Sequence, residues 1–387
     1  MPDGSEPLTI EVHSAIAEID AGQWDACAGD DPFTRHSFLS ALEDSGSVTA
    51  ENGWLPQHLS LSDSDGRLIA AAPLYLKNHS YGEYIFDWGW ADAYERAGGK
   101  YYPKLQSAVP FTPATGPRLL LRDGAPDRYH DVLIAGMIQL ARQHQVSSLH
   151  VTFPEEAQWH RLGDAGFLKR TSRQFHWENK GYASFDEFLG QLNSRKRKAI
   201  RKERREVAEQ NVTCKRLTGA DITEDHWDSF YHYYLNTIDH KWGRAYLTRE
   251  FFSILGETMS DMAMLVVAEQ DGERIAGALN LLGDDTIYGR NWGCSVEVKF
   301  LHFEACYYQA IDFAIENKLR WVEAGAQGPH KIQRGYLPRE VYSAHWIEDT
   351  NFRDAVAEFV KHEARDVDYE IKGLMGYSPY RQTGEDR

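Results

Sequence analysis

The spacing of apolar and polar positions along the chain predicts alternating strands and helices. The stretch Leu8–His13 predicts a strand, and apolar residues at three- and four-residue steps predict helices at Ala21–Ala28 and His36–Ser45. Two apolar runs joined through Asp65-Gly66 predict a hairpin, because Asp-Gly favours the tight turns between antiparallel strands. The stretch Tyr84–Trp90 is predicted to be the next strand. The first half of the chain therefore mixes both kinds of element.

The second half repeats this order of elements. Two helical stretches flank Gly243, and a second Asp-Gly hairpin follows at Asp271-Gly272. A strand at Thr286–Val296, a helix at His302–Asn317 and a strand at Leu319–Ala324 complete the pattern. Glycines inside the first of these strands indicate a bulge or the close approach of a ligand backbone.

Short motifs confirm that the two halves are related. Gly166–Trp177 and Gly335–Trp346 share a glycine, an aromatic residue, a leucine and a final His-Trp at the same spacing. Asp65–Ala70 likewise resembles Asp271–Ala276. Because the repeats are far longer than those of solenoids, we infer two similar domains in tandem.

The predicted domain layout follows from these repeats. The first domain covers 1–183, with an insertion at 91–128 that the second half lacks. A connecting helix covers 184–210, the second domain covers 211–375, and 376–387 is a polar tail. Two domains of this size can each bury a core.

Composition and charge narrow the functional classes. The chain has 387 residues and a formal net charge of −16, which argues against general attraction to nucleic acid or anionic membranes. No signal-peptide pattern and no bilayer-spanning stretch is present. The four cysteines are far apart and form no CxxC motif, so neither a metal site nor a disulfide framework is predicted. We expect a cytoplasmic protein.

The segment Ser184–Gln210 departs from this acidic average and is predicted to be one long helix. Ser184 and Glu187 form a capping box, and apolar residues recur along one side. Between Arg195 and Arg205 there are eight Lys or Arg residues and one Glu. This basic face could contact a tRNA, a carrier protein or a nucleotide-bearing donor, or it could pair with the acidic body and brace the fold.

Leu319–Pro338 predicts an anion site, because a strand, a glycine turn and a short basic helix follow one another. The free N–H groups of a helix start and nearby cations together suit a phosphate. Only the second half carries these cations. The predicted donor-binding residues are Gln327, Gly328, His330, Lys331 and Arg334. The alternative is a loop with solvated basic residues.

Aromatic and charged residues also gather at three further places. The stretch before and inside the insertion holds Asp87, Trp88, Trp90, Tyr94, Tyr102 and Lys104. The break near Gly243 adds Lys241 and Trp242, and the glycine-containing strand adds Trp292. Since long excursions often carry function, we predict that these residues bind the acceptor substrate. An ordinary aromatic core with one satisfied Asp is an equally good interpretation of the first group.

Several motifs together resemble a known family. FDWGWADAYER, YYPKL, the SRKRKAIRKER helix and EAGAQGPHK followed by RGYLP are similar to the FemAB-like N-acyltransferases of proteobacteria. The resemblance implies an α/β (α+β) chain of two tandem acyl-coenzyme-A N-acetyltransferase (GNAT) domains joined by a long basic helix. It also implies transfer of an acyl or aminoacyl group to an amine, as in peptidoglycan biosynthesis.

Amine acylation sets the predicted catalytic roles. Glu323 is the candidate base, and backbone N–H groups near Asn291 and Trp292 could hold the oxyanion. His330, His240 and Tyr288 are candidate acids. The alternative for Glu323 is a structural cap or a pair with Lys331.

No permanently bound cofactor is expected, and the donor could be acyl-coenzyme A, an acyl-carrier thioester or aminoacyl-tRNA. The Q/R-x-x-G-x-G/A signature of simple acetyltransferases is absent, with GAQGPHK nearest to it. Three function classes therefore stay open: a thioester-dependent N-acyltransferase, a tRNA-dependent aminoacyl ligase resembling FemX, and a non-catalytic binding protein.

Overall fold

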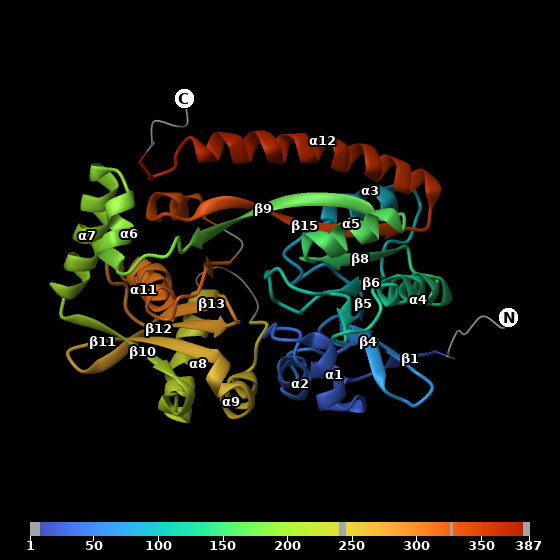
Figure 1. Ribbon diagram of the computed structural model, residues 1–387, viewed down its shortest axis with the longest axis horizontal. Coiled ribbons are helices and arrows are strands. Elements are labelled where there is room, and N and C mark those ends of the chain that lie inside the picture. Colours follow the sequence, from blue (N-terminus) through green and yellow to red (C-terminus); the bar gives the residue numbers. More distant parts are fainter. Residues whose placement is uncertain (1–7, 240–244, 326–327, 382–387) are drawn as a thin grey trace. The chain divides into compact units, whose positions relative to one another are not determined.

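The computed structural model describes residues 8–239, 245–325 and 328–381 (Figure 1). The chain divides into two compact units. Unit 1 comprises Met1–Ser172 and Glu340–Val367, and unit 2 comprises Arg173–Arg339 and Asp368–Arg387. Each unit therefore includes a segment from the other half of the sequence, which differs from the predicted consecutive domains 1–183 and 211–375.

Unit 1 contains two sheets and the helices that cover them. One sheet has the order β1-β3-β4-β7, and the other runs β2-β5-β6-β8-β15. The strands are β1 (Thr9–His13), β2 (Trp54–Pro56), β3 (His58–Ser62), β4 (Leu68–Ala72), β5 (Tyr75–Lys77), β6 (Lys104–Ser107), β7 (Leu120–Leu121), β8 (Ser148–Thr152) and β15 (Leu337–Ile347). The helices are α1 (Ala21–Ala28), α2 (His36–Asp44), α3 (Trp88–Arg96), α4 (Tyr129–Gln143), α5 (Glu156–Asp164) and the first part of α12 (Thr350–Met375).

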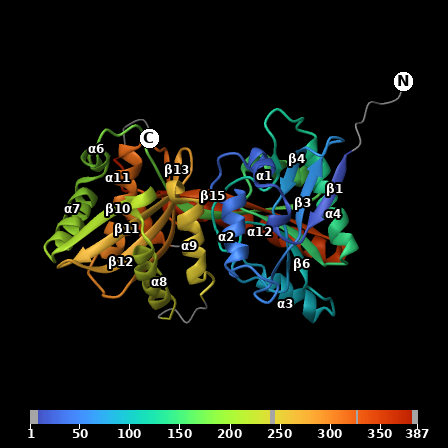
Figure 2. The same cartoon turned by 90° about the horizontal axis from the view of Figure 1, so that it is seen from below.

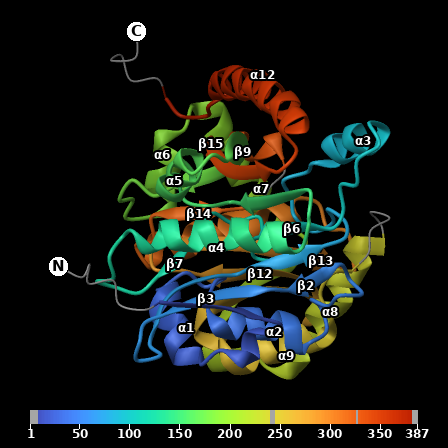
Figure 3. The ribbon, with the colours of Figure 1, turned by 90° about the vertical axis from the view of Figure 1, so that its right-hand side faces the viewer.

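Helix α4 covers the strands of unit 1 (Figure 3), and the core of this unit lies between them. Leu133 and Met137 on α4 are fully buried in one apolar cluster with Leu59 of β3 and Leu149 of β8. The strand, the two helices and the hairpin predicted for 8–72 are confirmed, the hairpin turning at Gly66 with a left-handed φ of 77°. For these elements, the sequence pattern that predicted them agrees with the burial of their apolar side chains.

Unit 2 contains strands that lie side by side in the order β10-β11-β12-β13-β14-β9. Its strands are β9 (Leu168–Glu178), β10 (Val212–Thr218), β11 (Ala263–Gln270), β12 (Glu273–Leu282), β13 (Thr286–Cys294) and β14 (Trp321–Glu323). Its helices are α6 (Phe185–Gln191), α7 (Ser194–Ala208), α8 (Glu224–Asp239), α9 (Arg249–Thr258), α10 (Leu301–Phe303), a π-helical turn (Glu304–Tyr308), α11 (Gln309–Glu316) and the short helix η5 (Pro329–Arg334).

Helices cover both faces of this sheet. α6, α7 and α11 share one apolar cluster with Val266, Ala278 and Val322. α8 packs on the other face (Figure 2). There a side chain at Gly293 would overlap the backbone of Tyr233 on this helix. The close approach that we predicted at this glycine is thus made by the helix backbone rather than by a ligand.

The repeated His-Trp motifs occupy equivalent positions in the two units. His176 and Trp177 of β9 pair with Glu323 and Val322 of β14 in unit 2. His345 and Trp346 of β15 pair with His150 and Leu149 of β8 in unit 1. The predicted duplication is confirmed, and each half supplies the last strand segment of the unit that the other half mainly builds.

Two predictions about elements are wrong. Ser184–Gln210 forms two helices, because Asn193 caps a second one by accepting from the N–H of Lys196. Tyr84–Trp90 is not a strand, since α3 begins at Trp88. Within the segment predicted to be a polar tail, Tyr380 forms an isolated β-bridge with Leu192. Among the described residues, no helix is long and apolar enough to cross a membrane.

Candidate functional site

A β-bulge opens the centre of the unit 2 sheet. Leu279 of β12 pairs with Asn291 of β13, but Asn280 pairs with Gly289, so that Arg290 is an extra residue. β13 also pairs with β14, in parallel, but only as far as Tyr288. Beyond this point β13 continues to Cys294 while β14 ends at Glu323. The bulge that the glycines predicted is confirmed, and it borders an opening between two parallel strands.

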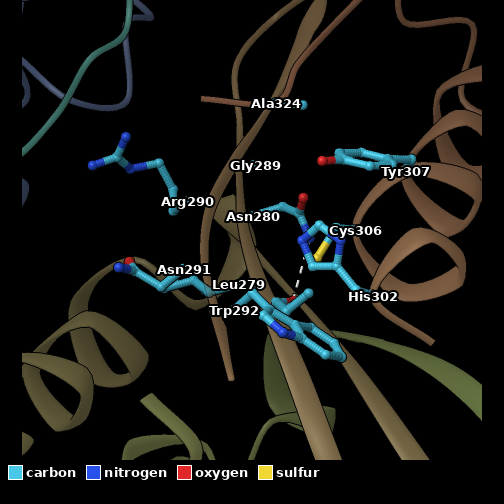
Figure 4. Close-up of a pocket in the computed structure, with 11 residues that line it drawn as sticks. Leu279, Asn280, Gly289, Arg290, Asn291, Trp292, His302, Cys306, Tyr307 and Ala324 are labelled. Atoms are coloured by element: carbon cyan, nitrogen blue, oxygen red, sulfur yellow. Dashed lines mark hydrogen bonds between the residues drawn. The ribbon is translucent and has the colours of Figure 1, made fainter. Parts of the chain in front are cut away.

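A cavity of about 90 Å³ lies at this opening (Figure 4). Gly289, Asn291, Trp292 and Ala324 line it from the strands. His302, Cys306 and Tyr307 line it from the helix side, and the hydroxyl of Tyr307 points towards the strands. The Tyr307 hydroxyl is 2.9 Å from Nε2 of His330. The π-helical turn at Glu304–Tyr308 carries two of these side chains, and such turns occur frequently at functional sites.

Strand alternation places two of the catalytic candidates, Glu323 and Tyr288, on the opposite face of the sheet. Val322 lies in the core beneath α11, so the next residue, Glu323, points away from that core. Tyr288 is the direct neighbour of Glu323 on β13, and His176 is its neighbour on β9. The structure therefore brings Glu323 and Tyr288 together beside the opening.

His176 is the polar neighbour of Glu323. Its Nδ1 lies 3.8 Å from Oε1 of Glu323, and its Nε2 lies 3.2 Å from the side-chain oxygen of Gln174. Burial, and then the positive charges of Arg339 and Lys331, lower the pKa of His176 to about 3. Near neutral pH the imidazole is therefore uncharged, and it forms no ion pair with the carboxylate.

The cations of the predicted donor site are buried and already paired. Nζ of Lys331 donates to the carbonyl oxygens of Ala324 (2.5 Å) and Gly325 (2.9 Å), and burial lowers its pKa to about 8. Arg334 forms an ion pair with Glu203 at 2.8 Å. The alternative of a loop with solvated basic residues therefore does not describe Lys331 and Arg334, and their binding of a donor stays a prediction.

The other predicted donor residues differ among themselves. Gly328 has a φ of 118°, and a side chain there would overlap His330. His330 is exposed and reaches the cavity through Tyr307. Burial, and then Arg334 and Lys331, lower the pKa of the imidazole. Gln327, His240, Lys241 and Trp242 lie outside the described residues.

In unit 1 the corresponding opening is filled by the chain itself. β6 pairs in parallel with β8 and ends at Ser107, and the following segment returns so that Gly116 bridges Pro154. The guanidinium of Arg118, 1% exposed, donates to the carbonyl oxygens of Thr152 (2.9 Å) and Ala114 (2.8 Å). This filling supports the prediction that only the second copy binds the donor.

Beneath the predicted acceptor cluster of unit 1 lies a buried charge network. Nζ of Lys104 donates to Asp87 (2.5 Å), Glu83 (2.8 Å) and Ser80 (2.8 Å). Burial alone would raise the pKa of Asp87, but Lys104 and then His150 bring it well below its usual value. Tyr102 contacts the network through Ser80 at 2.8 Å. Lys104 and Tyr102 are therefore structural supports.

Part of the acceptor cluster borders an open groove of about 850 Å³ between α3 and the start of α12. Asp87, Trp90 and Tyr94 line this groove. Trp88 is 47% exposed and stacks on Phe86 at the rim, with ring centroids 4.5 Å apart. The structure thus divides the cluster between a groove and the network under it.

The basic residues of α7 fall into two groups. Arg204 pairs with Glu304 (2.9 Å) and Asp312 (2.8 Å), and this arrangement braces the helix on unit 2. Arg195, Arg197 and Lys198, on the first turn, form no ion pair or hydrogen bond through their side chains with any residue that the structure describes. The helix therefore braces the fold with one part and presents free cations with another.

The sequence profile of the FemAB-like family, described as peptidoglycan biosynthesis/recognition, matches residues 15–382. The chain belongs to the FemAB-like family. No curated protein matches the sequence. FemX is similar in fold, with a TM-score of 0.56 and 11% identity over 91% of this chain and 100% of that chain.

Two other solved structures share the fold of this FemAB-like protein. The C-terminal domain (DUF2156) of a protein from Agrobacterium fabrum, assigned as a lysylphosphatidylglycerol synthetase, gives a TM-score of 0.56 at 10% identity over 88% of this chain and 96% of that chain. L-PGS from Bacillus licheniformis gives 0.51 at 11% identity over 86% of this chain and 97% of that chain. At these identities the likeness concerns the fold alone.

Proposed function

We propose that this FemAB-like protein is an N-acyltransferase that moves an acyl group from a thioester donor to an amine. The observation that carries the proposal is the opening between β13 and β14 at the bulge. There the strand backbones are released from pairing with each other, and polar side chains stand on both faces. Backbone groups freed in this way can hold a donor and a developing oxyanion.

In the proposed reaction the amine nitrogen attacks the thioester carbonyl carbon. A C–N bond forms, and the tetrahedral intermediate collapses with loss of the C–S bond. The amine loses a proton to Glu323, directly or through water, and the thiolate gains one. Backbone N–H groups near Asn291 and Trp292 would hold the oxyanion, and no metal or redox partner is required to balance the step.

Tyr307 and His330 are the proposed source of the proton for the thiolate. Burial raises the pKa of Tyr307 well above its usual value, so the hydroxyl keeps its proton at neutral pH. Its contact with His330 offers a path for replacing that proton. Tyr288, beside Glu323, remains the proposed alternative acid on the opposite face of the sheet.

The test measures release of free thiol from acetyl- and longer acyl-coenzyme A by the full-length protein with a panel of primary amines. Tyr307→Phe should lower kcat by about a hundredfold, as expected for loss of a general acid. Tyr308→Phe is the matched control, because Tyr308 bonds to Glu203 in the core. Equal activity of the two variants, or no thiol release with any amine, would contradict the proposal.

A second candidate function is aminoacyl transfer from tRNA, favoured by the free cations of the first turn of α7. On this hypothesis tRNA binding weakens steeply with salt, and Arg195→Glu with Lys198→Glu abolishes it. Arg204→Glu should instead lower stability, because Arg204 is paired inside unit 2. Tight, salt-sensitive tRNA binding by the wild-type protein would favour this function over the thioester donor. Failure to bind either donor would favour a non-catalytic binding protein.

A further inference from the structure

The groove of unit 1 is large enough for a small molecule and mostly apolar. Its volume of about 850 Å³ lies within the range of about 300–1,000 Å³ that is typical of ligand sites. Trp90 and Phe359 form an edge-to-face pair with centroids 6.1 Å apart, and Tyr94 stacks on Phe352 at 4.4 Å. Glycine and alanine residues of α3 leave the space between these rings open.

Two charged side chains in the lining are neutralised by the protein itself. Asp87 accepts from Lys104, Tyr101 and Ser80. Arg170 forms a bidentate pair with Glu363, both contacts being 2.7 Å, and lies over the ring of Trp90. Neither group needs a ligand charge, so the central part of the groove favours an apolar body.

One end of the groove carries a charge that the protein leaves without an ion pair. Asp349 is exposed, and one of its carboxylate oxygens caps α12 by accepting from the N–H of Phe352 at 2.7 Å. Within the described residues it forms no ion pair. The carboxyl end of α3 also lies at the groove, through Ala97 and Gly98.

The electrostatic balance at this end is negative. The start of α12 contributes roughly half a positive charge and the end of α3 roughly half a negative one, so the two helix ends offset each other. The full negative charge of Asp349 remains. A cation is therefore the complementary charge at this end, while aromatic rings and small residues continue along the groove.

We infer that the groove between α3 and α12 binds an amphipathic primary amine, with its ammonium group at Asp349 and its apolar body along Trp90 and Phe359. The inference is independent of the proposed function, because the groove lies in unit 1 and the opening at the bulge lies in unit 2. It assigns the groove a ligand class, an amine on a hydrocarbon or aromatic body, which the family description does not supply.

Binding is tested by calorimetry with octylammonium, octanoate and butylammonium on the full-length protein. Octylammonium should bind one equivalent, about tenfold or more tightly than either other probe, because octanoate reverses the charge and butylammonium shortens the body. Equal binding of octylammonium and octanoate would overturn the inference.

Two pairs of variants locate the binding. Asp349→Asn removes the charge but keeps a good helix cap, so the protein should fold and bind octylammonium about fivefold or more weakly. Asp354→Asn removes an equal charge from the same helix outside the groove and should bind as the wild type does. Ala93→Trp should fill the groove and prevent binding, whereas Asp92→Trp on the same helix should not. Binding unaffected by Asp349→Asn and Ala93→Trp would show nonspecific attraction to an acidic protein and refute the site.

The binding and transfer assays fail independently. Octylammonium binding without thiol release from any donor would leave the groove as an amine site and refute the acyltransferase. Thiol release with other amines, without octylammonium binding, would refute the amine site in the groove and leave the acyltransferase standing.

Discussion

Lys331 and Arg334 show how the neighbours of a cation decide its role. Both follow a glycine turn, where sequence favours an anion site, yet Lys331 is 2% exposed and Arg334 is 7% exposed. The guanidinium of Arg334 also lies 3.4 Å from the centroid of the Phe303 ring. We therefore expect a cation that is buried and paired in this way to contribute mainly to the stability of the fold.

Arg334→Ala should therefore lower the free energy of unfolding by about 3 kcal/mol, because it leaves Glu203 poorly solvated without its partner. Arg201→Ala is the control, since Arg201 pairs with Asp186 at the surface and such pairs contribute less than about 1 kcal/mol. Urea unfolding of both variants measures the difference. Similar losses would mean that burial of Arg334 adds nothing to its pair.

The histidine pair of unit 1 should make stability depend on pH. His150 and His345 face each other with their Nδ1 atoms 2.6 Å apart, and burial lowers the pKa of His150 to about 3 and that of His345 well below its usual value. Lys104 lowers the pKa of His150 further, while Asp87 raises it. The unfolded chain binds protons from about pH 6.5 downward, so stability falls as pH falls below this value.

Each neutral histidine accounts for at most about 1.4 kcal/mol of unfolding free energy per pH unit in that window. His345→Asn keeps an amide near the position of Nδ1 and removes one titrating group, so the loss between pH 6 and 5 should become shallower by about that amount. Urea unfolding at several pH values gives the slopes. Identical slopes would mean that His345 is not held neutral.

These residue-scale features could not be predicted from sequence for a definite reason. The partner of Arg334 is Glu203, on α7, and the partners of Lys331 are carbonyl groups whose direction depends on the turn after β14. Local patterns contain neither the distant residue nor the direction of a carbonyl group. Tyr307 was not predicted as a site residue, because no characteristic amino-acid composition identifies the π-helical turn that presents it.

At the scale of elements, the two glycines of β13 have different roles. Gly289 lies beside the bulge, where an added methyl group would be 3.3 Å from the carbonyl oxygen of Glu323. Gly293 lies under α8 and leaves no room for a methyl group. Gly289 thus borders the opening, and Gly293 allows α8 to pack closely on the sheet.

Gly293→Ala should destabilise the protein by about 2–3 kcal/mol, because α8 must shift to avoid the methyl group. Gly289→Ala should cost less, since the carbonyl oxygen of Glu323 would have to move by only a few tenths of an ångström. Thermal and urea unfolding of both variants tests the order. A reversed order would contradict the assignment of Gly293 to helix packing.

Elements with strong local signals were predictable. Asp271 and Gly272 both adopt positive φ, as their hairpin requires. The Ser184 side chain caps its helix by accepting from the N–H of Glu187, while the Glu187 carboxylate accepts from the N–H of Ala183. The strand predicted at Tyr84–Trp90 was wrong because an aromatic run is compatible with either a strand or a helix. The helix α3 begins here instead and buries Trp90. Asn193 was an available signal for the break before α7, since Asn favours helix caps.

At the scale of the molecule, the exchanged last strands tie each unit to both halves of the sequence. Ala344 and Trp346 lie in the core of unit 1, and Phe175 and Trp177 lie in the core of unit 2. Sequence repeats revealed the duplication, but not the exchange. A strand keeps its own pattern whichever sheet it joins, so the pattern alone does not name the partner.

Cutting the chain between the halves should test this dependence. Residues 1–183 alone lack the β15 segment of unit 1, and residues 184–387 alone lack the β9 segment of unit 2. Neither fragment should unfold cooperatively, whereas the coexpressed pair should copurify and regain a sharp transition, because buried side chains of each sheet come from the other fragment. Two independently stable fragments would contradict the exchange.

The exchange also limits how such a chain could have arisen. A single-copy ancestor whose last strand left its own sheet in the same way would have had an incomplete sheet. It would have folded only as a dimer in which each copy supplied a strand to the other. Fusion of two copies would turn the strand exchange between two molecules into an exchange within one molecule. Pairing would then no longer depend on protein concentration, and one copy would be free to lose its cleft, as the filling by Arg118 in unit 1 illustrates.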